Sequence, residues 1–282
     1  MATKIGYLGP PGTFTEEAAL LYDSKAQLVP FPTISGVGAA VVTGMVEEGL
    51  VAIENSIEGS VTDTLDLLIQ ESSLAIKQEI VLPIRHCLLV TPGGAANAIK
   101  VIYSHPQALA QCRRFLERCF PKAQLEAALS TAAAVEEIKN SDGSAAAVAT
   151  RRAAQLYGVE ILAHDIQETS SNVTRFVVLS STDHPPTGSD RTSLWFSFAD
   201  DRPGLLVAVL GQFAQRNINL AKVESRPSKE SLGQYIFLLD LDGHREESPV
   251  REALQEVEKT CSRLKILGSY PKYRPPEEGS PS

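Results

Sequence analysis

Polar side chains that could bind or activate a small molecule stand where predicted strands end. Ligands of open α/β proteins bind at the carboxyl ends of strands, so side chains in these positions are candidates for a site. Two such clusters are Glu54, Asn55 and Ser56 after a strand predicted at Leu50–Ile53, and Ser104, His105 and Gln107 after one predicted at Lys100–Tyr103. Turns and helix caps use the same residue types, so each cluster alone also has an ordinary structural explanation.

Two predicted helix starts add further candidates. GPPGTFTEEA is a Gly/Pro turn that leads into a helix, where backbone N–H groups and the helix dipole favour an anion. A plain structural turn explains this pattern equally well. Thr13 and Glu16 within it have the spacing of a capping box. The stretch STAAAVEEI places Ser130 and Thr131 at another helix start, and several such ends could converge on one cleft.

The stretch ETSSNVTRFVVLSS combines a polar half with an apolar half. Phe176–Leu179 is a continuous apolar, β-favouring run, which is typical of a strand buried on both faces. Thr174 and Arg175 close the polar half that leads into it. Neighbouring strand residues point to opposite faces, so these two side chains share a site only if the strand is not yet regular. The polar half is either turn chemistry or the rim of a site.

Composition narrows the class of protein. The chain has 282 residues, 43% hydrophobic and 21% charged, with a net charge of −8. This is ordinary for a soluble globular protein and gives no reason to expect a nucleic-acid or membrane partner. The start enters a strand at once, which predicts no signal peptide. Four cysteines do not make a disulfide framework or a zinc pattern, and we expect Cys112 and Cys119 to pack on one helix face in a reduced cytoplasm.

Strands and helices alternate up to a polar linker at 181–190. Strands are predicted at 4–8, 50–53, 100–103 and 145–149, extended structure at 76–90, and helices at 13–22, 35–47, from about 62, 107–119, 131–139 and up to Tyr157. This order predicts an α/β domain with mostly parallel sheets.

The last third has a different order. Leu194, Phe196 and Phe198 alternate with polar or amphipathic residues, which predicts a strand. A helix follows with Pro203 in its first turn and an apolar stripe at Leu206, Val209, Leu210, Phe213 and Ala214. Two strands at 217–227 and 233–241, a helix opening at Ser248, and a strand at 263–270 complete the order βαββαβ. This is a ferredoxin-like unit, typical of a binding module.

Taken together, the motifs resemble the prephenate dehydratase family in its single-activity form with a C-terminal ACT regulatory domain. The matching stretches come in the family's order and cover nearly the whole chain: GPPGTFTEEA, IENSIEGSV, SHPQALAQC, STAAA, AVATRRAAQLYGVEIL, NVTRF, GLLVAVLGQFAQRNINL and KVESRP. No helical chorismate-mutase domain precedes Lys4, so the resemblance is to the single-activity rather than the bifunctional form.

The resemblance implies a two-lobed catalytic domain, like periplasmic binding proteins, at 1–182. Lobe 1 is expected at about 1–76 and 160–182, lobe 2 at about 77–159, and the ferredoxin-like ACT domain at 190–272. The implied reaction converts prephenate to phenylpyruvate with loss of water and carbon dioxide. It needs no cofactor or metal, because the product ring becomes aromatic.

The resemblance also assigns roles to residues. Thr174 is expected to be essential, and we interpret its weakly acidic hydroxyl as a positioned donor to the leaving oxygen rather than as a general acid. The proton could come, through Thr174, from water or from a carboxyl group with a raised pKa, and Glu54 is the candidate for that carboxyl. Candidate substrate contacts are Thr13, Asn55, Ser56, Ser104, Gln107, Thr131, Arg175 and Phe176, with His105 a weaker candidate. Arg175 could anchor a carboxylate, and a structural arginine explains it equally well.

The C-terminal module is expected to bind L-phenylalanine, the end product, as a feedback effector. The expected effector residues are Gly204, Leu205, Leu206, Val207, Asn217, Glu224, Ser225, Arg226 and Pro227, with Asn219 as a further contact. ACT modules pair side by side, so a homodimer or homotetramer is expected. Two alternatives stay open: arogenate dehydratase, and a non-catalytic small-molecule sensor that signals through the C-terminal module.

Overall fold

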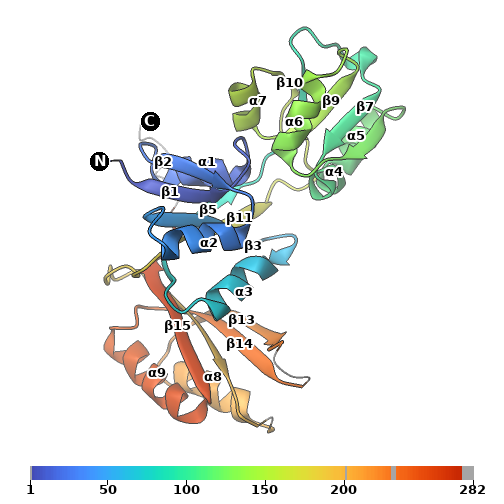
Figure 1. Ribbon diagram of the computed structural model, residues 1–282. Coiled ribbons are helices and arrows are strands. Elements are labelled where there is room, and N and C mark those ends of the chain that lie inside the picture. Colours follow the sequence, from blue (N-terminus) through green and yellow to red (C-terminus); the bar gives the residue numbers. More distant parts are fainter. Residues whose placement is uncertain (1, 201, 230–232, 275–282) are drawn as a thin grey trace. The chain divides into compact units, whose positions relative to one another are not determined.

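The computed structural model describes residues 2–200, 202–229 and 233–274. By contacts it divides into two units, Met1–Thr64 with Ile80–Phe176, and Leu65–Glu79 with Val177–Ser282. The first unit contains the second sheet and most of the first, and the other contains the third sheet (Figure 1). Among the described residues, no helix is long and apolar enough to cross a membrane.

The first sheet has mostly buried central strands, β3 (Glu48–Asn55) and β11 (Val173–Ser180). Its strands run in the order β2 (Gln27–Phe31), β1 (Lys4–Leu8), β3, β11 and β5 (Ala75–Pro83). β1 is parallel to both neighbours, with Tyr7 opposite Pro30 and Leu50. The short β4 (Gly59–Ser60) turns back against the end of β3. Helix α1 (Phe14–Tyr22) connects β1 to β2, and α2 (Ile34–Val42) connects β2 to β3. Helix α3 (Thr62–Gln70) lies between β4 and β5.

The second sheet carries helices on both faces. Its strands run in the order β10 (Glu160–Ala163), β6 (Cys87–Val90), β9 (Ala145–Ala149), β7 (Val101–Ser104) and β8 (Gln124–Ala127). The central β9 is almost entirely alanine and fully buried, and its alternate residues join two different apolar clusters. Its helices are α4 (Pro106–Gln111), α5 (Arg113–Cys119), α6 (Thr131–Lys139) and α7 (Arg151–Tyr157), besides the short η1 (Ala96–Ala98).

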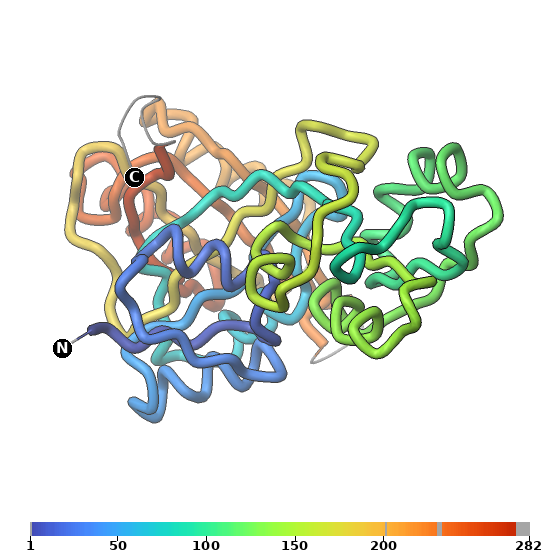
Figure 2. Tube along the Cα trace, turned by 90° about the horizontal axis from the view of Figure 1, so that it is seen from above, coloured from blue at the N-terminus to red at the C-terminus, as the bar shows by residue number. Residues whose placement is uncertain are grey.

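Two connecting segments, residues 84–86 and 164–172, link the first and second sheets (Figures 1 and 2). Backbone hydrogen bonds tie them together: the N–H of Ile84 donates to the carbonyl of Asn172 over 2.8 Å, and the N–H of Ile166 donates to that of His86 over 3.0 Å. Because residues far apart in sequence are fixed side by side here, the segments can position side chains from both sheets.

The third sheet confirms the predicted βαββαβ order. Its strands are arranged as β13 (Leu220–Pro227), β14 (Tyr235–Asp242), β12 (Asp190–Ser197) and β15 (Arg263–Pro271), all antiparallel. Helices α8 (Leu205–Ala214) and α9 (Ser248–Thr260) pack on one face, around Phe196, Phe213 and Val257. Residues 75–79 of β5 and most of α3 belong to the same unit as this sheet.

Several predicted boundaries were wrong for identifiable reasons. Helix α2 ends at Val42 rather than 47, because the Thr43 hydroxyl donates back to the Ala39 carbonyl and Gly44 takes a φ of 71°. The expected helix at 107–119 breaks at Cys112, which is buried, whereas Cys119 is exposed. The prediction that both cysteines pack in the core is therefore wrong for Cys119.

Two predicted helix starts also differ. The Thr13 side chain makes no cap, and the Glu16 carboxylate accepts the N–H of Gly12, one residue before the N-cap, over 2.6 Å, so the predicted capping box is not formed. Helix α8 begins at Leu205 behind Gly204, whose φ of 91° excludes most side chains, so Pro203 lies before the first turn. The predicted apolar stripe of α8 is confirmed except at Ala214, which is exposed. Strands β2, β8 and β10 were not predicted.

Candidate active site

A cavity of about 520 Å³ lies in the first unit, lined by both sheets and by the connecting segments. Residues at the ends of β1, β3 and β11 contribute from the first sheet, and the starts of α4 and α6 contribute from the second. For β1 and β3, and for β7 and β8 before these two helices, these are the carboxyl ends of strands, where open α/β folds hold ligands, whereas β11 contributes its amino end. The predicted candidates that line the cavity are Thr13, Asn55, His105, Gln107, Thr131, Thr174 and Phe176.

A hydrogen-bond network runs along the wall of this cavity and starts from fixed backbone groups. The N–H groups of Ile57 and Glu58 donate to Oδ1 of Asn55 over 2.9 and 3.1 Å, which settles which end of this amide is the oxygen. Nδ2 of Asn55 therefore donates, over 2.9 Å to Oδ1 of Asn172 and over 2.8 Å to Oγ1 of Thr174. The three side chains are buried.

The same order of donors and acceptors continues on the side of the cavity that faces the second sheet. Since Oδ1 of Asn172 accepts, its Nδ2 donates to Oε1 of Gln111 over 3.0 Å. Nε2 of His86 lies 3.0 Å from that same oxygen, so Nε2 must carry the proton. Burial lowers the pKa of His86, which favours the neutral ring. The backbone N–H groups between β3 and β4 thus determine, through Asn55, Asn172 and Gln111, which ring nitrogen of His86 carries the proton.

The network leaves two hydrogen-bond donors for a ligand. Oγ1 of Thr174 accepts from Asn55, so its hydroxyl hydrogen is free to donate to a ligand. Oε1 of Gln111 is occupied twice, and its NH₂ group makes no hydrogen bond with any residue that the structure describes. Both residues line the cavity. The preorganised groups are therefore donors, which suit an oxygen acceptor on the ligand.

The cavity lining includes no arginine or lysine among the described residues. Groups that favour an anion come instead from the N-termini of α1 and α6, both nine residues long, whose first residues Phe14 and Thr131 line the wall, which also includes Glu58. Helix N-termini offer unpaired N–H groups and a favourable dipole for an anion. Apolar side chains complete the wall: Phe14, Val61, Ile84, Leu129 and Phe176. Leu129 is 95% exposed and so available to contact a ligand.

Four predicted site residues do not line the cavity. Glu54 and Arg175 lie on the other face of their strands and form an ion pair with each other, 3.0 Å apart. The hydroxyl of Ser104 is buried and donates to the Val148 carbonyl over 2.6 Å, so it fastens two strands. Oγ of Ser56 accepts the N–H of Val173 over 3.0 Å, which ties β3 to β11.

Three side chains of this hydrogen-bond network escaped the sequence prediction: His86 and Gln111, which line the cavity, and the buried Asn172. His86 stood inside an extended segment without a motif, and Gln111 lay inside the family-matching stretch SHPQALAQC but in the body of a predicted helix, where it was not selected. Asn172 stood in the polar half of ETSSNVTRFVVLSS, which was the available signal. Within the part of the chain that the structure describes, no group of three or more His, Cys, Asp or Glu side chains is placed to hold a metal ion.

The expected effector residues gather on two elements of the C-terminal sheet domain. Gly204 to Val207 form the start of α8, and 224–227 form the end of β13. Glu224 pairs with Lys222 over 3.1 Å, and Arg226 pairs with Asp66 of α3 over 3.0 Å. Asn217 follows α8 in the left-handed region, with a φ of 57°, a position that asparagine tolerates.

The sheets, the donor-lined cavity and the appended βαββαβ domain define an α/β protein that binds a small anionic ligand and carries a C-terminal binding module. The prephenate dehydratase family model matches residues 5–184, and the ACT domain model matches residues 196–259. The chain therefore belongs to the prephenate dehydratase family.

Three known proteins show the extent of this likeness. The chain is 46% identical over 270 residues to a bifunctional chorismate mutase/prephenate dehydratase of Aquifex aeolicus, covering 95% of this chain and 74% of that protein. The crystal structure of a prephenate dehydratase in complex with L-Phe from Arthrobacter aurescens superposes with a TM-score of 0.89 at 35% identity, covering 95% and 90% of the two chains. GqqA, described as a quorum quenching acylase, superposes with a TM-score of 0.88 at 32% sequence identity, covering 96% of this chain and 98% of that one.

Proposed function

We propose that this chain converts prephenate to phenylpyruvate, carbon dioxide and water. The observation that carries the proposal is the pair of fixed donors, Thr174 and Gln111, in a cavity whose remaining wall suits an anion with an apolar ring. Catalysis by orientation and preorganised donors is what this substrate requires, because aromatisation of the ring supplies the driving force.

The departing hydroxyl is the group that needs help. Prephenate carries two carboxylates, and its conversion to the phenylpyruvate anion consumes one proton, which leaves with the hydroxyl as water. Thr174 donates a hydrogen bond to that oxygen as the C–O bond breaks, while the ring carboxylate leaves as carbon dioxide. Glu54 is held by Arg175 and does not line the cavity. We therefore assign the proton to a water molecule in the open cavity, and the Thr174 hydroxyl passes it to the leaving oxygen.

The substrate's charges and ring match the two sides of the cavity. The pyruvyl carboxylate lies toward the N-termini of α1 and α6. Backbone N–H groups there, rather than an arginine side chain, replace the water that solvates the carboxylate. The ring lies between Phe14, Ile84 and Phe176. Gln111 donates to an oxygen of the substrate, and Asn172 and His86 hold that amide in its donor orientation.

Regulation by L-phenylalanine follows from the C-terminal domain and from the relative solved with L-Phe. We place the effector between the start of α8 and the end of β13. Gly204 allows a close backbone approach, and Leu205 and Val207 offer apolar surface. A second copy of the chain completes this site in a homodimer or homotetramer. The four free cysteines are consistent with a cytoplasmic enzyme.

The direct test follows phenylpyruvate by its ultraviolet absorbance in alkali after incubation with prephenate. Turnover well above the uncatalysed rate is expected, and a rate no higher than that would exclude the enzyme and favour a sensor. The same assay with arogenate, followed through phenylalanine, compares kcat/KM for the two substrates. An N-acyl homoserine lactone is the third substrate, because of the likeness to GqqA, and we expect no hydrolysis of its amide.

A further inference from the structure

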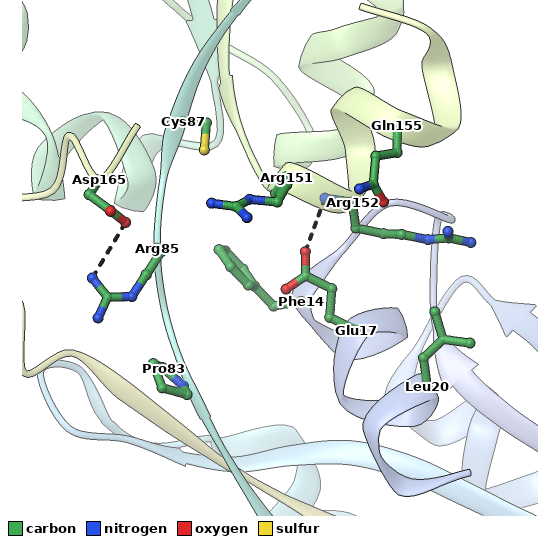
Figure 3. Close-up of a pocket in the computed structure, with 10 residues that line it drawn as sticks. All are labelled: Phe14, Glu17, Leu20, Pro83, Arg85, Cys87, Arg151, Arg152, Gln155 and Asp165. Atoms are coloured by element: carbon green, nitrogen blue, oxygen red, sulfur yellow. Dashed lines mark hydrogen bonds and ion pairs between the residues drawn. The ribbon is translucent and has the colours of Figure 1, made fainter. Parts of the chain in front are cut away.

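A second cavity, of about 580 Å³, lies beside the connecting segments, and the proposed reaction does not use it (Figure 3). This volume falls within the range of about 300–1,000 Å³ that is usual for small-molecule sites. Helix α1 supplies Phe14 and Leu20, and helix α7 supplies Arg151. The connecting segments and the end of β5 supply Pro83, Arg85 and Asp165.

The acidic groups around this cavity already have partners. Asp165 pairs with Arg85 over 3.4 Å. Oε1 of Glu17 accepts the backbone N–H of Arg152 over 3.2 Å, and burial raises the pKa of this carboxyl, which weakens its negative charge. The Arg152 side chain is engaged by Glu16, 3.2 Å away. The ligand preference of the cavity therefore depends on the remaining cation.

That cation is Arg151. Its guanidinium makes no hydrogen bond or ion pair with any residue between 2 and 274 whose position is described. In Figure 3 it extends from α7 across the cavity, above the Phe14 ring, toward the strand that carries Cys87, whereas Arg152 turns away. A planar guanidinium with its donors free is the group that best binds a carboxylate through two parallel hydrogen bonds.

We propose that this cavity binds a small carboxylate with a flat apolar body, its carboxylate on Arg151 and its body against Phe14. Leu20 and Pro83 provide the rest of the apolar surface, and the weakly paired Arg85 adds positive charge on the opposite wall. An amine would instead meet Arg151 with no free carboxylate to offset it.

An occupant would touch the wall of the substrate cavity. Phe14 lines both cavities, and its ring stands edge-on to His86 with the centroids 5.4 Å apart and an interplanar angle of 82°. His86 in turn bonds to Gln111. A ligand on Phe14 therefore shifts the KM for the substrate, through a site separate from the C-terminal domain.

The test uses 4-fluorobenzoate and 4-bromobenzoate with the full chain. Fluorine NMR titration of 4-fluorobenzoate gives the affinity, and the anomalous signal of bromine in crystals grown with 4-bromobenzoate gives the position. Replacing Arg151 by Gln removes the charge-assisted bonds and should weaken binding by about 10-fold or more. Arg113→Gln is the matched control, since it removes an exposed arginine of α5 outside this cavity.

A bromine peak beside Arg151 and Phe14, with weaker binding in Arg151→Gln and unchanged binding in Arg113→Gln, supports the proposal. Equal affinity in the Arg151 variant, a bromine peak only elsewhere, or no binding at millimolar concentration overturns it. The result is separate from the proposed reaction, because binding is measured without prephenate. If the chain binds the probe but does not turn over prephenate, the proposed reaction is wrong and the proposed binding site stands.

Discussion

At the scale of residues, the hydrogen bonds that the cavity offers a ligand depend on the orientation of three side-chain amides, those of Asn55, Asn172 and Gln111. Asn55 receives two backbone N–H groups, and every later partner in the network follows from that fact. Asn55 and Thr174 were predictable as cavity residues from sequence, because a polar residue at a strand end is a visible signal, whereas Phe176 became a candidate only through the resemblance. The pairing of Asn55 with Asn172 was not, since it joins residues 117 positions apart and depends on strand order.

Asn172→Asp tests the network. Aspartate presents only acceptors, so it would repel Oε1 of Gln111 and favour the flipped amide, with that oxygen facing the substrate. We expect kcat/KM for prephenate to fall by about 10–100-fold, the value of a hydrogen bond to a charged group. Steady-state kinetics and thermal unfolding of Asn172→Asp, with Asn140→Asp on the exposed end of α6 as control, separate this effect from misfolding. Unchanged kcat/KM would contradict the assigned polarity.

The tautomer of His86 is a second prediction at this scale. Burial lowers its pKa below the ordinary 6.5, so the folded chain binds this proton less tightly than the unfolded chain. The contribution of neutral His86 to stability is therefore present above about pH 6.5 and is lost as the pH falls. Nitrogen-15 NMR should show a neutral ring protonated at Nε2 at pH 8, which takes up its second proton at a lower pH than an exposed histidine. A ring protonated at Nδ1, or one already charged at pH 7, would refute the network.

At the scale of elements, helix α3 connects Arg226, one of the proposed effector residues, to a cavity strand. Its Thr64 hydroxyl donates to the Ala52 carbonyl of β3 over 2.6 Å, and Ala52 lines the substrate cavity. One half-turn later, Asp66 pairs with Arg226, whose Nη1 is buried without a partner. Near its other end, Nζ of Lys265 binds the Leu68 carbonyl over 2.6 Å. Displacement of Arg226 by an effector would therefore act on α3.

Asp66→Asn should leave prephenate turnover unchanged but weaken inhibition by L-phenylalanine about 5-fold or more, the lower range of measured couplings. The neutral amide no longer holds Arg226 and Lys229 by charge, whereas Asp63→Asn on the exposed first turn of α3 removes no ion pair among the described residues and serves as control. Inhibition curves for the two variants provide the measurement. Indistinguishable curves would show that α3 is not the route.

Element types were largely predictable, because helical period marks α6, a short continuous apolar run marks β9, and period and alternation mark the βαββαβ order. Their ends were not predictable where one local interaction decides. Helix α2 stops at the back-bonding Thr43, and the helix at 107–119 breaks at Cys112. Strand β8 is exposed along its whole length, so no apolar pattern marked it.

At the scale of the whole molecule, the C-terminal sheet presents β13 at its edge, and Val223 on that strand and Val207 on α8 are 49% and 72% exposed. Exposed edges and apolar side chains need covering, so we expect at least a dimer. Light scattering at micromolar concentration should report two or more copies. A monomer both with and without L-phenylalanine would rule out an effector site shared between copies.

The central claim is that the Thr174 hydroxyl donates to the leaving oxygen of prephenate. The most direct measurement compares kcat for the wild type, Thr174→Ser and Thr174→Ala in the phenylpyruvate assay. The serine variant keeps the donor and should retain most of the activity. The alanine variant should lose about 100–1,000-fold, the scale for one transition-state donor. Equal activity in the two variants would contradict the claim, because the side chain would then matter only for packing.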